Sequence, residues 1–177
     1  MNGRLGFSIA VLLMASACAT EGVTPPMAGA PPAAATAAFR TSDFAWSTAP
    51  GSGQITGQLS YRPMGKVHSC AAAGVLLTPD TPWVRSRMNI LYSSTEKAVL
   101  PADEVRRRTP PERSQDYSSF VRRTTCDAQG RFSFTGLPDG TWYAITVARP
   151  VPAGSGPDMA IMRRVTTKGA KVVKVTL

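Results

Sequence analysis

Apolar and polar residues alternate along several short stretches of this chain. Every second position carries the apolar residues in four of them: GQITGQLSY (53–61), RFSF (131–134), TWYAITV (141–147) and KVVKVTL (171–177). Because successive side chains of a strand point to opposite faces, this pattern predicts half-buried β-strands. Their apolar faces need a second layer to cover them.

Turn residues separate these stretches. Residues 127–130 begin with Asp and end with Gly, and residues 137–140 have Pro second and Gly fourth, which are preferences of type I turns. Residues 167–170 connect a further strand, MAIMRRVT (159–166), to the last one. Short strands with such turns predict one all-β domain over 51–177, a sandwich of about seven strands.

One stretch departs from the alternation. Thr81 can cap a helix whose first residue is a proline, and Val84, Met88 and Leu91 then share one helical face. We expect a short helix here, with a strand as the competing interpretation. The whole connection from 83 to 117 is longer than most loops, so we expect an enlarged polar loop that carries any special surface.

The first 50 residues differ from the rest. Residues 1–17 have the layout of a secretory signal peptide, with Arg4, an apolar run over 5–15 and small residues at its end. The apolar run is too short to cross a bilayer. Residues 18–50 are rich in Ala and Pro and poor in large apolar residues, so they predict a disordered tether.

Cys18 follows the signal peptide directly. The residues Ala15-Ser16-Ala17-Cys18 resemble the lipobox of bacterial lipoproteins, in which the cysteine thiol receives a diacylglyceryl group. The resemblance implies a lipid anchor at Cys18, and Ala19 in place of Asp implies the outer membrane. Ala15 departs from the commoner Leu, which leaves a soluble periplasmic protein as the alternative.

Two further cysteines, Cys70 and Cys126, remain in the predicted domain. In an exported protein such a pair predicts a disulfide. The bond would close a loop of about 57 residues and contribute roughly 4 kcal/mol to stability in the chain-entropy model. A zinc site is disfavoured because His68 is the single histidine and no CxxC pair is present.

Three segments resemble the carboxypeptidase regulatory-like domains, which are transthyretin-like β-sandwiches. The segments are GQITGQLSY, GVLLTP (74–79) and CDAQGRFSFTGLPDGTWY (126–143). The residues characteristic of that family occur here as Thr125, Gly130, Phe132, Phe134, Leu137, Pro138 and Gly140, followed by Trp142-Tyr143. The resemblance covers most of 53–148. It implies the transthyretin-like fold and a structural or binding module.

Candidate catalytic residues are few. A Ser-His-Asp triad would have to use His68, and a thiol nucleophile would need Cys70 or Cys126 to be free. Asp103 and Glu104 are adjacent, so on a helix they would point in different directions and could not act as an acid/base pair. We therefore expect no enzyme activity, no catalytic residue, no metal and no cofactor.

The charge of the chain is strongly positive, with 20 Lys and Arg against 11 Asp and Glu and a net charge of +9. Much of it lies in the groups Arg106-Arg107-Arg108, Arg122-Arg123 and Arg163-Arg164. Export argues against nucleic acid as a partner, and the aromatic residues of a single-strand platform are missing. A positive field in the envelope would attract anionic polymers or an acidic protein. The alternative is a solvated face with arginines paired to nearby carboxylates.

Two functions from different classes follow. The first is a non-catalytic envelope lipoprotein whose sandwich docks to a protein partner through a sheet edge or the loop at 95–117. The second is a binding module for an anionic envelope glycan or lipid headgroup, with Arg106, Arg107 and Arg108 as the binding residues.

Overall fold

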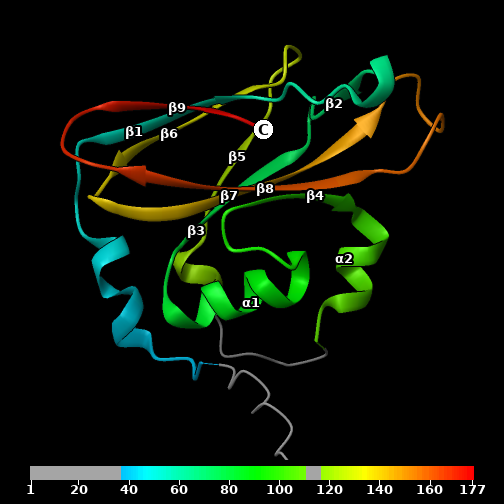
Figure 1. Ribbon diagram of the computed structural model, residues 1–177. Coiled ribbons are helices and arrows are strands. Elements are labelled where there is room, and N and C mark those ends of the chain that lie inside the picture. Colours follow the sequence, from blue (N-terminus) through cyan, green and yellow to red (C-terminus); the bar gives the residue numbers. More distant parts are fainter. Residues whose placement is uncertain (1–36, 111–116) are drawn as a thin grey trace, which may run out of the picture. The chain divides into compact units, whose positions relative to one another are not determined.

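The computed structural model describes residues 37–110 and 117–177, which form three layers (Figure 1). A three-stranded sheet makes one outer layer and has the strand order β6-β1-β9. Strand β1 pairs antiparallel with β6 and parallel with β9. The bounds are β1 (Gly53–Gln58), β6 (Arg131–Leu137) and β9 (Val172–Thr176).

A six-stranded sheet makes the middle layer. Its order is β4-β8-β7-β3-β5, all antiparallel, and the short β2 pairs with the end of β7. The bounds are β2 (His68–Ser69), β3 (Gly74–Pro79), β4 (Lys97–Pro101), β5 (Arg122–Thr125), β7 (Gly140–Pro150) and β8 (Met159–Thr167). The described residues therefore form the predicted all-β sandwich, with nine strands instead of about seven.

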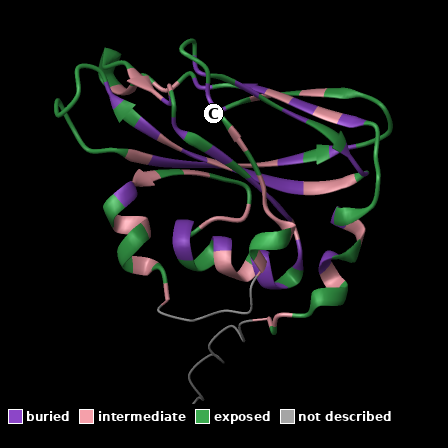
Figure 2. Ribbon diagram, turned by 180° about the vertical axis from the view of Figure 1, so that it is seen from behind, coloured by how far each residue is buried: buried purple, intermediate pink, exposed green. Residues whose placement is uncertain are grey.

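The two α-helices cover the other face of the larger sheet, and Figure 2 shows buried positions alternating with exposed ones along them. The α-helices are α1 (Pro82–Tyr92) and α2 (Ala102–Arg108), and the 3₁₀-helices are η1 (Thr41–Thr48), η2 (Pro63–Gly65) and η3 (Tyr117–Phe120). The expected helix is confirmed as α1, since the Thr81 hydroxyl accepts a hydrogen bond from the Val84 amide at 3.2 Å.

The middle sheet is buried on both faces. On β7, Trp142 and Ala144 pack in a core between the two sheets, whereas Tyr143 and Ile145 face a second core beneath the helices. Alternate residues of TWYAITV therefore face two different buried cores. The strand does not have one buried and one solvated face. The sequence pattern predicted one covering layer, and the structure has two.

The prediction of a polar loop over 83–117 is wrong for the part that the structure describes. It contains most of α1, then β4 and α2. Helix α2 has Asp103 and Glu104 in its first turn and three arginines in its last turn, so its charges complement the helix dipole at both ends. Strand β4 pairs along its length with β8.

The expected end of the tether at residue 50 is also wrong. Phe44 of η1 is fully buried and stacks on Phe120, with ring centroids 4.8 Å apart. Trp46 packs edge-on against Trp142 at 4.9 Å, and a Cβ on Gly140 would lie 2.1 Å from the Trp46 ring. Large aromatic residues therefore fold this end of the segment onto the domain. The signal peptide, Cys18 and the first part of the tether lie outside the described residues.

Candidate binding site at the open side of the sandwich

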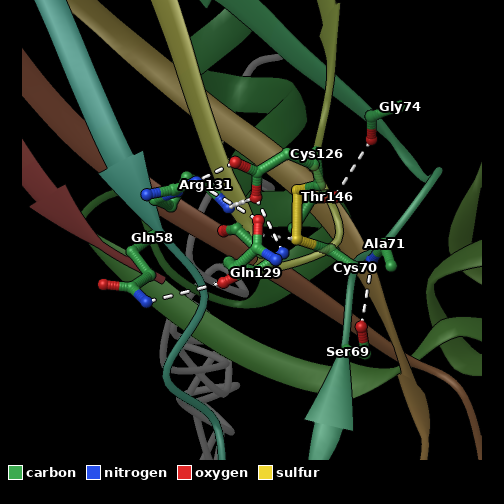
Figure 3. Close-up of a disulfide and its surroundings, with 11 residues drawn as sticks. Gln58, Ser69, Cys70, Ala71, Gly74, Cys126, Gln129, Arg131 and Thr146 are labelled. Carbon is green, nitrogen blue, oxygen red and sulfur yellow. Dashed lines mark hydrogen bonds and ion pairs between the residues drawn. A yellow bond between two sulfur atoms is a disulfide. The ribbon is translucent and has the colours of Figure 1, made fainter.

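The predicted disulfide is present, because Cys70 and Cys126 are bonded and buried, with their Cα atoms 5.7 Å apart (Figure 3). Beside it, the Asp127 carboxylate accepts hydrogen bonds from the backbone amides of Gln129 and Arg131. These bonds, with that from the Arg131 amide the strongest, lower the pKa of Asp127. The disulfide leaves neither thiol free as a nucleophile.

His68 lies at the edge of the larger sheet. Its ring contacts the ring of Tyr61, with centroids 5.0 Å apart, and its Nδ1 lies 3.3 Å from the Lys66 carbonyl oxygen. The ring nitrogen thus meets a backbone carbonyl and not the carboxylate of a triad. Residues 37–110 and 117–177 also contain no cluster of three His, Cys, Asp or Glu residues that could hold a metal.

The predicted binding residues Arg106, Arg107 and Arg108 lie on α2. Arg106 forms an ion pair with Asp103, and Arg108 forms one with Glu104. Arg108 also donates hydrogen bonds to the Leu91 carbonyl and the Ser93 hydroxyl, at 3.3 and 2.9 Å. Only Arg107 of the three has no recorded partner in the described part of the chain. The triplet is therefore mostly neutralised, as a solvated face would be.

Arg164 belongs to a second ion-pair network, which sequence reasoning missed. The Asp80 carboxylate, 1% exposed, is contacted by Arg164 at 2.8 Å and by Arg85 at 3.0 Å. Arg164 also pairs with Glu96 at 3.2 Å. The hydrogen bonds to Asp80 raise the pKa of both arginines. A lone Asp between a buried strand and a helix was the available signal.

An open cavity of about 450 Å³ lies where the smaller sheet leaves β4 uncovered. On β4, Ala98 and Leu100 pack toward the helices, so Lys97 and Val99 face the side of the smaller sheet. We call this cavity the trough. Its lining consists of Ser60, Tyr61, Lys97, Ala98, Val99, Ile161, Met162, Arg163, Thr176 and Leu177.

Two cations stand side by side in the trough. Lys97 of β4 and Arg163 of β8 are direct partners in the strand register. Like charges opposite each other destabilise a pair of strands. Neither side chain has a recorded hydrogen-bond or ion-pair partner within 37–110 and 117–177, so the charge is available to an anion. The sequence could not show this, because the pairing of β4 with β8 comes from the topology.

Tyr61 forms the aromatic end of the trough. The backbone fixes its position, because the Ser60 amide donates to the Leu177 carbonyl at 2.7 Å and the His68 amide donates to the Tyr61 carbonyl at 3.2 Å. Tyr61 also lines a second hollow of about 180 Å³, together with Arg62, His68, Gln129 and neighbouring residues. Two hollows with cationic side chains therefore meet at Ser60 and the half-buried Tyr61.

Comparison with known proteins gives a likeness of fold. No family model matches the chain, and no curated protein matches it. A solved structure of a candidate carbohydrate-binding protein from Pseudomonas aeruginosa is similar, with 23% identity and a TM-score of 0.56, and the match covers 78% of this chain and 97% of that one. This likeness supports the sandwich fold. Within the part of the chain that the structure describes, no helix is long and apolar enough to span a bilayer.

Proposed function

We propose that this chain is a non-catalytic binding module that holds an acidic glycan in the trough. The observation that carries the proposal is the unpaired couple of Lys97 and Arg163, directly opposite each other and facing an open cavity. A carboxylate or sulfate group bound between them would remove the repulsion and gain charge-assisted hydrogen bonds. The site is therefore selective for acidic ligands.

The shape of the site favours a sugar polymer over a single small anion. Tyr61 offers an apolar ring with a polar hydroxyl, which suits the apolar face of a pyranose and its hydroxyl groups. Because Tyr61 lines both hollows, successive sugar units can cross from Lys97 and Arg163 toward Arg62. The carbohydrate-binding name of the Pseudomonas protein agrees with this choice of ligand.

The cellular setting in this proposal is the bacterial outer membrane, with a lipid anchor at Cys18. The supporting features are the signal-peptide layout and the lipobox resemblance. The resemblance to carboxypeptidase regulatory-like domains agrees with a binding role without catalysis. In cells fed a clickable palmitate analogue, the wild-type chain should become labelled, and Cys18→Ser should abolish both labelling and sedimentation with membranes.

The test of glycan binding compares hexagalacturonate with uncharged maltohexaose by isothermal titration calorimetry. We expect only the acidic oligomer to bind, with an affinity that falls as salt is raised from 50 to 300 mM. The reason is that the screening length shortens with salt, to about 10 Å at 0.1 M and less above it. Lys97→Ala with Arg163→Ala should weaken binding at least about tenfold, the equivalent of one charge-assisted hydrogen bond.

The matched control removes more positive charge elsewhere. Arg106→Ala, Arg107→Ala and Arg108→Ala together should leave hexagalacturonate binding within about twofold, because two of the three arginines are already paired. Equal loss in the two variants would show that net charge alone attracts the polymer. Unchanged binding in the Lys97/Arg163 variant would refute the trough as the site.

A protein partner is the second candidate, and one observation favours it. Strand β4 is an edge strand, and Val99 is 39% exposed beside its unpaired edge. An extended peptide could add to this edge with apolar anchors in the trough. A photo-crosslinker at position 99 would then give one discrete protein adduct that persists at high salt, whereas a glycan ligand would give none.

A further inference from the structure

A second cavity lies on the opposite face of the larger sheet, beneath α1. It has a volume of about 150 Å³. Its floor includes Thr78 of β3 and Ile145 of β7, and Met88 and Leu91 of α1 form its roof. Tyr92 and Tyr117 also line it. The cavity is thus apolar on most sides and separate from the trough.

The Thr78 side chain is the unusual feature of this cavity. Thr78 is 4% exposed, and its hydroxyl has no hydrogen-bond partner among the described residues. The other buried threonines have partners: Thr81 accepts from the Val84 amide, Thr146 donates to the Gly74 carbonyl, and Thr167 donates to the Pro138 carbonyl. Because buried polar groups are almost always paired, an unpaired hydroxyl on a residue that lines a cavity points to a ligand.

We propose that this cavity binds a small neutral aromatic alcohol of the phenol class. An apolar cavity of about 150 Å³ is large enough for one benzene ring. A ring in contact with Met88, Leu91 and Ile145 can place its hydroxyl against that of Thr78. Burial raises the pKa of Tyr92 to about 12, so the apolar surroundings favour the neutral form of a phenol over the phenolate.

The rim of this cavity is open to a ligand, and the charged residue of the lining is turned toward another side chain. Leu76 lines the cavity and is 36% exposed, so one wall reaches solvent. Arg87 also lines the cavity, but its guanidinium lies over the Trp83 ring, 5.5 Å from the centroid. The Thr78 hydroxyl, a buried polar group of the lining that has no partner among the described residues, is then available to select among ligands of equal size.

The experiment titrates phenol and toluene separately into the ¹⁵N-labelled protein and follows amide chemical shifts. We expect saturable shifts around Thr78 and Met88, with phenol bound about fivefold more tightly than toluene, the equivalent of one neutral hydrogen bond. Thr78→Val keeps the side-chain shape and should reduce phenol to the affinity of toluene. Leu76→Trp should block both ligands from the rim.

Two controls make the result specific. Thr146→Val removes a buried hydroxyl on the other face of the sheet and should leave the preference for phenol unchanged. Lys97→Ala with Arg163→Ala should also leave the preference for phenol unchanged. The proposals for this cavity and for the trough are therefore tested independently. The proposal is overturned if phenol gives no saturable shifts up to its solubility limit, or if Thr78→Val retains the preference.

Discussion

Two adjacent arginines of β8 lie on opposite faces of the larger sheet and have opposite surroundings. Arg164 points toward the helices, where it pairs with Asp80 and Glu96. Arg163 points into the trough, where it faces Lys97 and has no recorded partner among the described residues. One residue of displacement along a strand changes the face, and here it also changes the role of the charge. Cationic residues that look alike in sequence thus divide into a structural set and an available set.

The two faces also differ in the interaction that links distant segments of the chain. On the side of the smaller sheet, the bond between Cys70 and Cys126 joins the region before β3 to the residue after β5. On the helical side, Asp80 joins the start of α1 to β8 through Arg85 and Arg164. The disulfide restricts the unfolded chain, whereas the ionic tie depends on a buried carboxylate paired with two partly exposed arginines.

Loss of the disulfide should have the largest effect. Cys70→Ala with Cys126→Ala should reduce the free energy of unfolding by about 4 kcal/mol, because the unfolded chain regains a long closed loop. Urea unfolding monitored by circular dichroism measures this change. A loss below about 1 kcal/mol would mean that apolar packing alone holds the sandwich side.

Loss of the ionic tie should come next. Asp80→Asn leaves Arg85 and Arg164 without their shared carboxylate and should cost about 3 kcal/mol, the lower end for a broken buried pair, since both arginines are partly solvated. The matched control is Asp103→Asn, which breaks an exposed pair with Arg106 and should cost less than about 1 kcal/mol. Equal costs would show that Asp80 is no more important than a surface carboxylate.

The sequence predicted features that depend on local order. The positions of the alternating strands, the cap at Thr81 and the pair of Cys70 and Cys126 each have a short-range or compositional signal, and all three are confirmed. The helical layer over the sheet had no such signal beyond α1. Phe44 and Trp46 in η1 follow an Ala/Pro-rich stretch whose composition indicates a tether, yet each packs against residues distant in the chain.

The candidate site was harder to predict than the fold. The run of three arginines predicts a binding site at Arg106, Arg107 and Arg108, but the helix places Asp103 and Glu104 within reach of two of them. Lys97 and Arg163 are 66 positions apart and become neighbours only through the register of β4 with β8. Non-local pairing of this kind leaves no trace in one sequence.

The smallest expected effect separates stability from function in the trough. Lys97→Glu replaces a like-charge pair by an opposite-charge pair with Arg163, so it should raise the free energy of unfolding by about 0.5 kcal/mol. The same change should abolish hexagalacturonate binding, because the carboxylate occupies the place of the ligand. Lys174→Glu on β9, opposite Thr56, makes the same change in net charge outside the trough. Lys174→Glu should change neither the free energy of unfolding nor hexagalacturonate binding. If the two variants behave alike in urea unfolding and calorimetry, the effect of Lys97→Glu is one of net charge, and the trough has no special role.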